Sequence, residues 1–154
     1  MIALTALPRD RAGRARHLRV DPAQEPFCGS IDSHLSADEP SCDWHVVEED
    51  GSVLGFFKID RDYVAHMPLA RPGELGLRGV MIDRAHQGRG AGRAAMAALP
   101  VYLRRAYPVA PACLLTVNTT NPRARAVYLA AGFRDTGLCH PGRIGPQNVL
   151  RLDL

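Results

Sequence analysis

The stretch Gln87-Gly88-Arg89-Gly90-Ala91-Gly92-Arg93 lies between an apolar run, Val80-Met81-Ile82, and an alanine-rich run from Ala94 to Leu103. Three alternating glycines leave the backbone without side chains where a strand would turn into a helix. The first amides of a helix have no partner within it and point outward at its positive end, where they bind phosphate oxygens. Arg89 and Arg93 add cationic donors that suit the same oxygens. The stretch therefore predicts a strand–loop–helix unit that binds a phosphate-bearing cofactor.

The spacing of these glycines distinguishes the loop from two other phosphate-binding loops. Glycines at 88, 90 and 92 do not fit G-x-G-x-x-G, and no Lys-Ser or Lys-Thr pair completes a G-x-x-x-x-G-K-[ST] loop. A glycine-rich turn with solvent-exposed arginines is the alternative for the loop taken alone. The rest of the chain decides between the two.

Length and composition favour one globular domain. A chain of 154 residues with 46% hydrophobic residues is long enough to bury a sizeable core. No apolar run reaches membrane-spanning length, and the apolar stretch 1–7 lacks the flanking features of a secretory signal. The four cysteines show no C-x-x-C spacing and the six histidines no H-E-x-x-H spacing. We therefore expect no metal site, no membrane partner and a cytoplasmic location.

Charge is distributed unevenly along the chain. Between Val20 and Phe57 there are nine acidic residues and no Lys or Arg, so all nineteen basic residues lie elsewhere. A basic remainder suits an anionic cofactor, and an acidic N-terminal segment suits a cationic second substrate. Asp32, Asp38 and Glu39 are the candidate acceptor-binding residues. Because the arginines are dispersed and lack interleaved aromatic residues, we expect no nucleic-acid partner.

Turn signals divide the chain into alternating strands and helices, which predicts an α/β or α+β fold around a mixed sheet. Strands are expected at 1–7, 44–47, 53–59, 74–82, 113–118, 133–138 and 149–152. Helices are expected at 9–20, 27–35, 91–105 and 122–131, with Pro100 kinking or ending the third. Asn121 as N-cap, Pro122 at the first position and Gly132 at the C-terminal end define the last helix.

A strand, a Q-x-x-G-x-G loop, a helix and a strand are followed by N-x-x-A-x-x-x-Y-x-x-x-G-F, here Asn121 to Phe133. This order of motifs resembles the GNAT superfamily of acyl-CoA N-acetyltransferases. The resemblance covers about residues 75–138 and implies a mixed, mostly antiparallel sheet of six to seven strands flanked by about four helices. It divides the single domain into an acceptor-side half at 1–72, an acetyl-CoA-binding core at 73–138 and a C-terminal hairpin strand at 139–154.

A weaker resemblance points to bacterial diamine and spermine/spermidine acetyltransferases. It rests on Met81-Ile82-Asp83 and on the pattern Leu18-x-Val20-x-x-x-Gln24-x-x-Phe27. It implies a polyamine acceptor, which the acidic N-terminal segment would bind. A pocket of this kind needs several carboxylates that converge on the cation, and the sequence does not show that convergence.

The superfamily resemblance also implies roles for individual residues with acetyl-CoA as the cosubstrate. The backbone of Val80, Met81 and Ile82 would pair with the pantetheine arm, and the loop from Gln87 to Arg93 would bind the pyrophosphate. Asn121 would hydrogen-bond the pantetheine, and Tyr128 would protonate the departing thiolate. Asn121 and Tyr128 are seven residues apart, so they lie on nearly the same helix face. The structural alternatives are a plain N-cap for Asn121 and a core aromatic for Tyr128.

The expected chemistry is direct attack of a primary amine on the acetyl thioester. No Cys or Ser lies in a recognisable elbow or triad, so no covalent intermediate is predicted. The amine must lose a proton to a base or to ordered water. Glu74 is the candidate base because it is the only carboxylate on the strand before the loop, although it lies at the start of that strand. His45 and His66 are further candidates.

Two other functions stay open. One is acetylation of protein N-terminal or lysine amines, and the other is a module that binds acetyl-CoA without turnover. The resemblance also implies a homodimer, for which the edge strands of an open sheet offer an interface.

Overall fold

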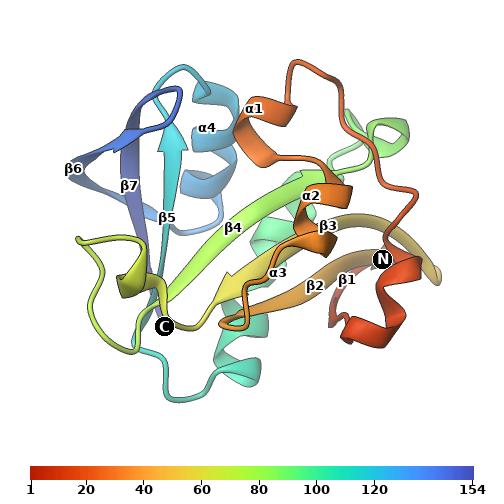
Figure 1. The fold of residues 1–154 in the computed structure, drawn as a ribbon, viewed down its shortest axis with the longest axis horizontal. Helices are drawn as coiled ribbons and strands as arrows, with labels where there is room; N and C mark the ends of the chain where they lie inside the picture. The colour runs from red at the N-terminus through yellow and green to blue at the C-terminus, as the bar shows by residue number, and fades with distance from the viewer.

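A seven-stranded sheet runs through the molecule in the order β1-β2-β3-β4-β5-β7-β6 (Figure 1). The computed structural model describes residues 1–154. The strands are β1 (Ile2–Ala6), β2 (Cys42–Glu49), β3 (Ser52–Asp60), β4 (Leu75–Ile82), β5 (Ala112–Asn118), β6 (Arg134–Gly142) and β7 (Gly145–Asp153). All neighbouring strands are antiparallel except β4 and β5. The predicted mixed, mostly antiparallel sheet is confirmed.

The parallel pair β4 and β5 separates soon after it begins. Only Leu75 with Cys113 and Gly76 with Leu114 are in register. On its other edge, β5 pairs with β7 along its whole length. From residue 77 onward, β4 and β5 therefore turn unpaired backbone edges toward each other, and this opening positions the candidate site.

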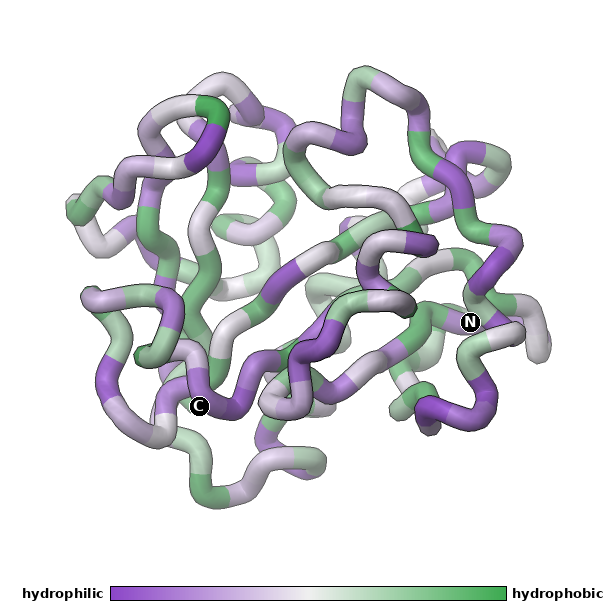
Figure 2. Tube along the Cα trace, viewed as in Figure 1, coloured by the Kyte–Doolittle hydropathy of each residue, from purple (hydrophilic) through white to green (hydrophobic).

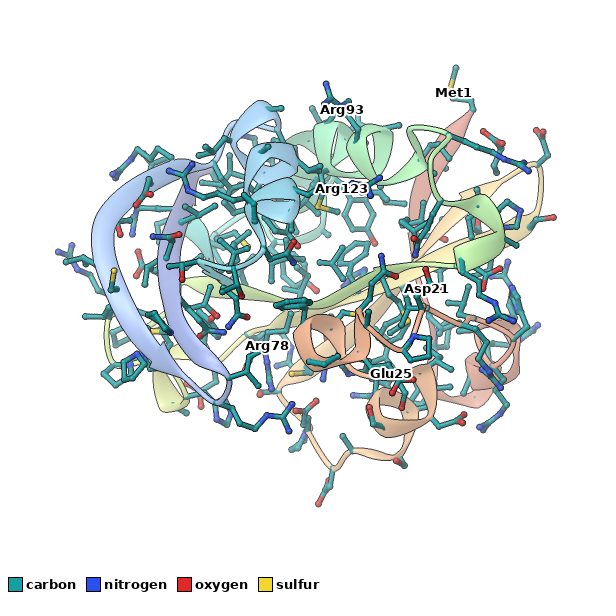
Figure 3. The ribbon with its side chains drawn as sticks, turned by 90° about the horizontal axis from the view of Figure 1, so that it is seen from above. Met1, Asp21, Glu25, Arg78, Arg93 and Arg123 are labelled. Atoms are coloured by element: carbon teal, nitrogen blue, oxygen red, sulfur yellow. The ribbon has the colours of Figure 1, made fainter.

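Helices cover both faces of the sheet. They are α1 (Glu25–Cys28), α2 (Ile31–Ser36), α3 (Ala91–Ala106) and α4 (Pro122–Ala130), with 3₁₀ turns at Arg9–Arg14, Tyr63–Ala65 and Arg84–His86. Figures 1 and 3 place α1 and α2 on one face and α3 and α4 on the other. No helix is long and apolar enough to cross a membrane.

Hydrophobic clusters form on both faces of the sheet because successive residues of a strand point in opposite directions. Phe57 on β3 packs with Leu99 and Leu103 of α3, whereas its neighbour Phe56 packs with Trp44 and the N-terminal segment. In Figure 2, hydrophobic positions recur along the central strands. The sheet is therefore buried on both sides at its centre.

The segment predicted as a helix at 9–20 is a shorter 3₁₀ helix at Arg9–Arg14. Ala12 is its one buried residue, and the buried Ala15 and Leu18 follow at intervals of three residues in i→i+3 turns rather than in an α-helix. The helix predicted at 27–35 is divided into α1 and α2. Gly29, with φ of 75°, ends α1, and Ser30 starts α2 through a reciprocal capping box with Ser33.

Pro100 does not end α3, which continues to Ala106. A proline inside a helix removes one hydrogen bond and costs about 3 kcal/mol or more. The buried stripe formed by Met96, Leu99 and Leu103 offsets this loss by packing against the sheet. The last predicted helix is confirmed as α4, whose N-cap Asn121 accepts a hydrogen bond from the Ala124 amide at 3.3 Å.

Candidate active site

Two cavities lie where β4 and β5 separate. The loop cavity, of about 480 Å³, is bounded by the end of β4, the loop 86–93, the start of α3 and α4. The interstrand cavity, of about 250 Å³, lies between residues 77–80 of β4 and 115–118 of β5. Six residues line both, and they mark the junction of the two cavities: Phe27, Cys28, Val80, Asn121, Ala124 and Tyr128.

Glycine geometry shapes the floor of the loop cavity. Gly88 and Gly90 have φ of 76° and 80°, which favours glycine over residues with a side chain. Gly90 is the N-cap of α3 and offers no side chain to the first amides of that helix. A Cβ on Gly92 would lie 3.5 Å from the Ile82 side chain. The positive end of α3 therefore reaches the cavity with unpaired amides, which suits a phosphate.

Arginine side chains add positive charge to the same cavity. Arg93 from α3 and Arg123 from α4 both line it, and the structure gives neither an ion pair within the chain (Figure 3). Arg89 is exposed and does not line the cavity, in contrast to the other six residues of the loop 87–93. Val80, Met81 and Ile82 line the cavity along the end of β4.

Gln87 fixes the loop to its surroundings. Its Nε2 donates to the carbonyl of Ile82 at 2.9 Å, which holds the loop against the end of β4. The same side chain exchanges two further hydrogen bonds with Gln24, just before α1. The loop is thus tied both to the central strand and to the segment that leads into α1.

A bulge in β4 shapes the interstrand cavity. The register with β3 shifts between Phe56 and Lys58, and Gly79 has φ of 62°. The His34 ring packs against Gly79 so closely that a Cβ there would lie 2.8 Å from Cε1. Bulged residues fall out of the ladder and redirect their backbone groups. The bulge therefore places Gly79 and Val80 at the cavity without pairing them to β3.

Tyr128 lies at the junction of the two cavities. Its ring packs edge-on against Phe133, with centroids 5.9 Å apart. Burial, together with the nearby Cys28, raises its pKa well above the usual range, so the phenol stays protonated at neutral pH. Burial and the charge of Glu25 also raise the pKa of the Cys28 thiol to about 11. Both groups are neutral at this point of the molecule, and the phenol keeps a proton that it can donate.

Asn121 caps α4 and also lies at the cavities. Its Oδ1 caps α4, and its side chain also lines both cavities. The amide nitrogen is left for a ligand. Asn121 and Tyr128 thus face one space from the same helix.

The predicted carboxylates are not brought together at the cavities. Glu74 is 3% exposed, accepts from the Arg71 amide at 2.7 Å and pairs with Arg151. Glu39 pairs with Lys58 at 2.6 Å and with Arg78 at 3.0 Å. None of these groups lines a cavity except Arg78.

The remaining acidic and histidine candidates also lie away from the cavities. Asp32 and Asp38 are exposed. His45 is buried against Tyr102 and Tyr107, and burial lowers its pKa to about 4. His66 is exposed and approaches Asp60 at 3.8 Å. No group of three or more His, Cys, Asp or Glu side chains that could hold a metal ion is present.

Sequence reasoning missed several residues that line the cavities, among them Arg123, Cys28 and Asn118. Arg123 could have been found, because it lies in the first turn of α4, two residues after Asn121. Cys28 and Asn118 carry no local signal, because α1 and the end of β5 reach the site only through the fold.

Comparisons with known proteins identify the family. Residues 12–133 match the Acetyltransferase (GNAT) family. The chain is similar to an uncharacterized N-acetyltransferase, YbbJ of Bacillus subtilis (strain 168), with 30% identity over 109 residues. This match covers 68% of the chain and 66% of that protein, slightly less than two thirds of its length.

Solved structures share the fold over nearly the whole chain. The aminoglycoside acetyltransferase AAC(6')-Ib in complex with coenzyme A has a TM-score of 0.79 at 16% identity, with 99% of this chain and 95% of that one covered. A chimera of the Vibrio cholerae spermidine N-acetyltransferase SpeG and hSSAT has a TM-score of 0.69 at 18% identity, covering 99% and 95%. These low identities show the fold alone. With the family match over residues 12–133, the chain belongs to the acetyltransferase (GNAT) family of acyl-CoA-dependent N-acetyltransferases, whose cosubstrate is acetyl-CoA.

Proposed function

We propose that this protein transfers the acetyl group of acetyl-CoA to a primary amine by direct attack. The observation that carries the proposal is that a cavity lined by Arg93 and Arg123 and a second cavity without any carboxylate meet at Tyr128. Acetyl-CoA bound in the loop cavity would place its thioester at this junction, and the acceptor amine would approach the thioester from the interstrand cavity. We further propose a cytoplasmic location, which the four free thiols suit.

The loop cavity has the groups that acetyl-CoA needs. The amides at the start of α3, with Arg93 and Arg123, would bind the pyrophosphate. The unpaired edge of β4 at Val80 to Ile82 would pair with the pantetheine amides as an added strand would. Asn121 would donate its free amide N–H to the same arm. The acetyl thioester would then lie beside Tyr128.

The transfer needs one bond made, one bond broken and two proton movements. The neutral amine forms a C–N bond to the thioester carbon, the C–S bond breaks, and Tyr128 gives its proton to the leaving sulfur. A backbone amide near the β4 bulge would stabilise the oxyanion that develops. The polar side chains lining the interstrand cavity include Tyr63, Thr116, Asn118 and Gln147, none of which is a base at neutral pH. We therefore propose that water carries away the proton of the amine, and Glu74 has no part in the step.

A narrower hypothesis, suggested by the acidic N-terminal segment, is that the primary amine acceptor is a polyamine. Its support is the charge of the segment and a weak motif resemblance. In the structure, Glu39 is engaged by Lys58 and Arg78, while Asp32 and Asp38 are exposed and line neither cavity. The geometry thus supports an acceptor amine but offers no second site for a cation.

A panel of amines tests the proposed function. Coenzyme A release would be measured with spermidine, diamines, amino acids, amino acid amides, aminoglycosides and short peptides, beside calorimetric binding of acetyl-CoA. The proposal predicts release that depends on an added small amine. Turnover confined to peptides would favour a protein acetyltransferase. Tight acetyl-CoA binding without release on any amine would contradict the enzyme and favour a binding module.

A further inference from the structure

Asn118, at the end of β5, has a buried hydrogen-bond donor without a partner. Its side chain lines the interstrand cavity and the residue is only 6% exposed. Its Oδ1 accepts a hydrogen bond from Gln147 Nε2 at 3.4 Å, which leaves Nδ2 with no acceptor in the protein. Buried polar groups are nearly always paired, so an unpaired one needs an explanation. A ligand oxygen in the cavity would provide the missing acceptor.

The other groups around this cavity do not favour a second cation. No Asp or Glu lines it. Arg78 does, and its guanidinium is held by Glu39 at 3.0 Å and by Asp60 at 3.2 Å. Burial raises the pKa of Tyr63, so this phenol is neutral as well. An ammonium group in this space would lose its water and gain no carboxylate in exchange.

The size of the cavity suits a small acceptor. Its volume of about 250 Å³ lies below the range of roughly 300–1,000 Å³ that is common for drug-sized ligands. The cavity meets the loop cavity at Tyr128, so the acceptor amine must reach that end. The part of the acceptor next to its amine would then lie along β5 toward Asn118.

We infer that the acceptor carries, beside its amine, a carboxylate or carboxamide oxygen that accepts a hydrogen bond from Asn118 Nδ2. This inference rests on the proposed function and names its substrate class: amino-acid-like amines rather than polyamines. Asn118 is a specificity residue: its side-chain amide binds the oxygen of the acceptor, while the acetyl transfer takes place at the other end of the cavity. A site built to donate to an oxygen discriminates strongly against analogues that lack one.

A set of acceptors with one carbon skeleton tests the inference in the unmodified protein. Alanine, alaninamide and 1,2-diaminopropane differ only in the group beside the amine, and β-alanine, its amide and 1,3-diaminopropane repeat the comparison one carbon longer. We expect kcat/KM for at least one oxygen-bearing acceptor to exceed that of its matched diamine by about tenfold or more. A preference for the diamines in both sets would overturn the inference and leave the proposed function standing.

Asn118→Asp tests the residue itself, because it replaces the donor with a carboxylate of nearly the same shape. We expect kcat/KM for the amino acid to fall about tenfold or more and its ratio to the matched diamine to shift toward the diamine. Asn148→Asp is the control: it makes the same change one residue from Gln147, on a side chain that lines neither cavity. Equal losses on all acceptors for Asn118→Asp would overturn the inference.

The two levels of failure are distinguishable. If acetyl-CoA binds but no acceptor in the panel releases coenzyme A, the proposed function fails. If turnover occurs with no preference for an oxygen-bearing acceptor, only the assignment of Asn118 fails.

Discussion

The side-chain amides of Gln24 and Gln87 exchange two hydrogen bonds, at 3.1 and 2.9 Å. The pair connects the start of α1 to the loop that faces the proposed pyrophosphate site. Phe27 and Cys28 of α1 line both cavities. Helix α1 and the loop 87–93 are therefore held in a fixed position relative to each other.

Removing this pair should weaken cofactor binding, because it loosens the loop that lines the proposed cofactor cavity. We expect Gln24→Ala to lower the affinity for acetyl-CoA about three- to tenfold, the amount that one or two hydrogen bonds contribute. Because both residues act through one contact, Gln24→Ala should add little to the effect of Gln87→Ala. Calorimetry on the two single variants and the double variant measures this. Fully additive losses would contradict the coupling.

Charge in the loop cavity should determine cofactor affinity. We expect Arg123→Gln and Arg93→Gln each to weaken coenzyme A binding about tenfold, because each removes a charge-assisted donor. Arg89→Gln is the matched control, because Arg89 belongs to the same loop but does not line the cavity. It should change the affinity by less than about twofold. The losses should shrink with acetyl-pantetheine, which lacks the pyrophosphate. Equal losses for all three variants would show that only the overall charge matters.

The bulge at Gly79 should not tolerate a side chain. We expect Gly79→Ala to lower the free energy of unfolding by about 2–4 kcal/mol, because φ of 62° is strained for alanine and the Cβ would meet the His34 ring. Gly73→Ala supplies the control, since its φ of 87° is equally strained but nothing lies within 4 Å. Denaturant unfolding of the two variants separates backbone strain from the clash with His34. A smaller loss at Gly79 than at Gly73 would contradict the packing described here.

His45 should make the fold sensitive to acid. Tyr107 donates to Asp43 at 2.7 Å and accepts from His45 Nε2–H at 3.0 Å, so Nδ1 is left to accept from Tyr102 at 2.6 Å. Burial lowers the pKa of His45 to about 4, below its unfolded value of 6.5. The neutral ring therefore contributes stability that is present above pH 6.5 and is lost as the pH falls toward 4, about 3 kcal/mol in all.

The acid sensitivity of His45 can be measured by denaturant unfolding between pH 4 and pH 7. His45→Gln should be less stable than the unmodified protein at pH 7 and should lose part of the decline toward pH 4. The exposed His66→Gln should keep that decline. A pH dependence unchanged by His45→Gln would show that other groups cause it.

Local sequence signals were sufficient where one segment determines its own structure. The glycine loop, the hairpin turn at Asp50 and Gly51, and the capped helix α4 are of this kind, because their geometry depends on glycines, an N-cap and a proline within a few residues. The division of 27–35 into two helices escaped prediction although Gly29 and Ser30 carried the signal.

Signals failed where the role of a residue depends on distant partners. Glu74 was a candidate base by its strand, but Arg151, which pairs with it, is 77 residues away. The acidic segment suggested a pocket for a cation, but Lys58 and Arg78 engage Glu39. Asn118 became a candidate only when the separation of β4 and β5 placed it in a cavity.

Tyr128→Phe is the most direct test of the central claim, because it removes one hydroxyl from the junction of the cavities and leaves the ring packed on Phe133. With an acceptor that the protein acetylates, we expect kcat to fall about a hundredfold while the affinity for acetyl-CoA stays within about twofold. Since the pKa of Tyr128 is raised, the unmodified enzyme should also keep its activity as the pH rises past 10, where an ordinary tyrosine would lose its proton. Unchanged turnover in Tyr128→Phe would contradict the account.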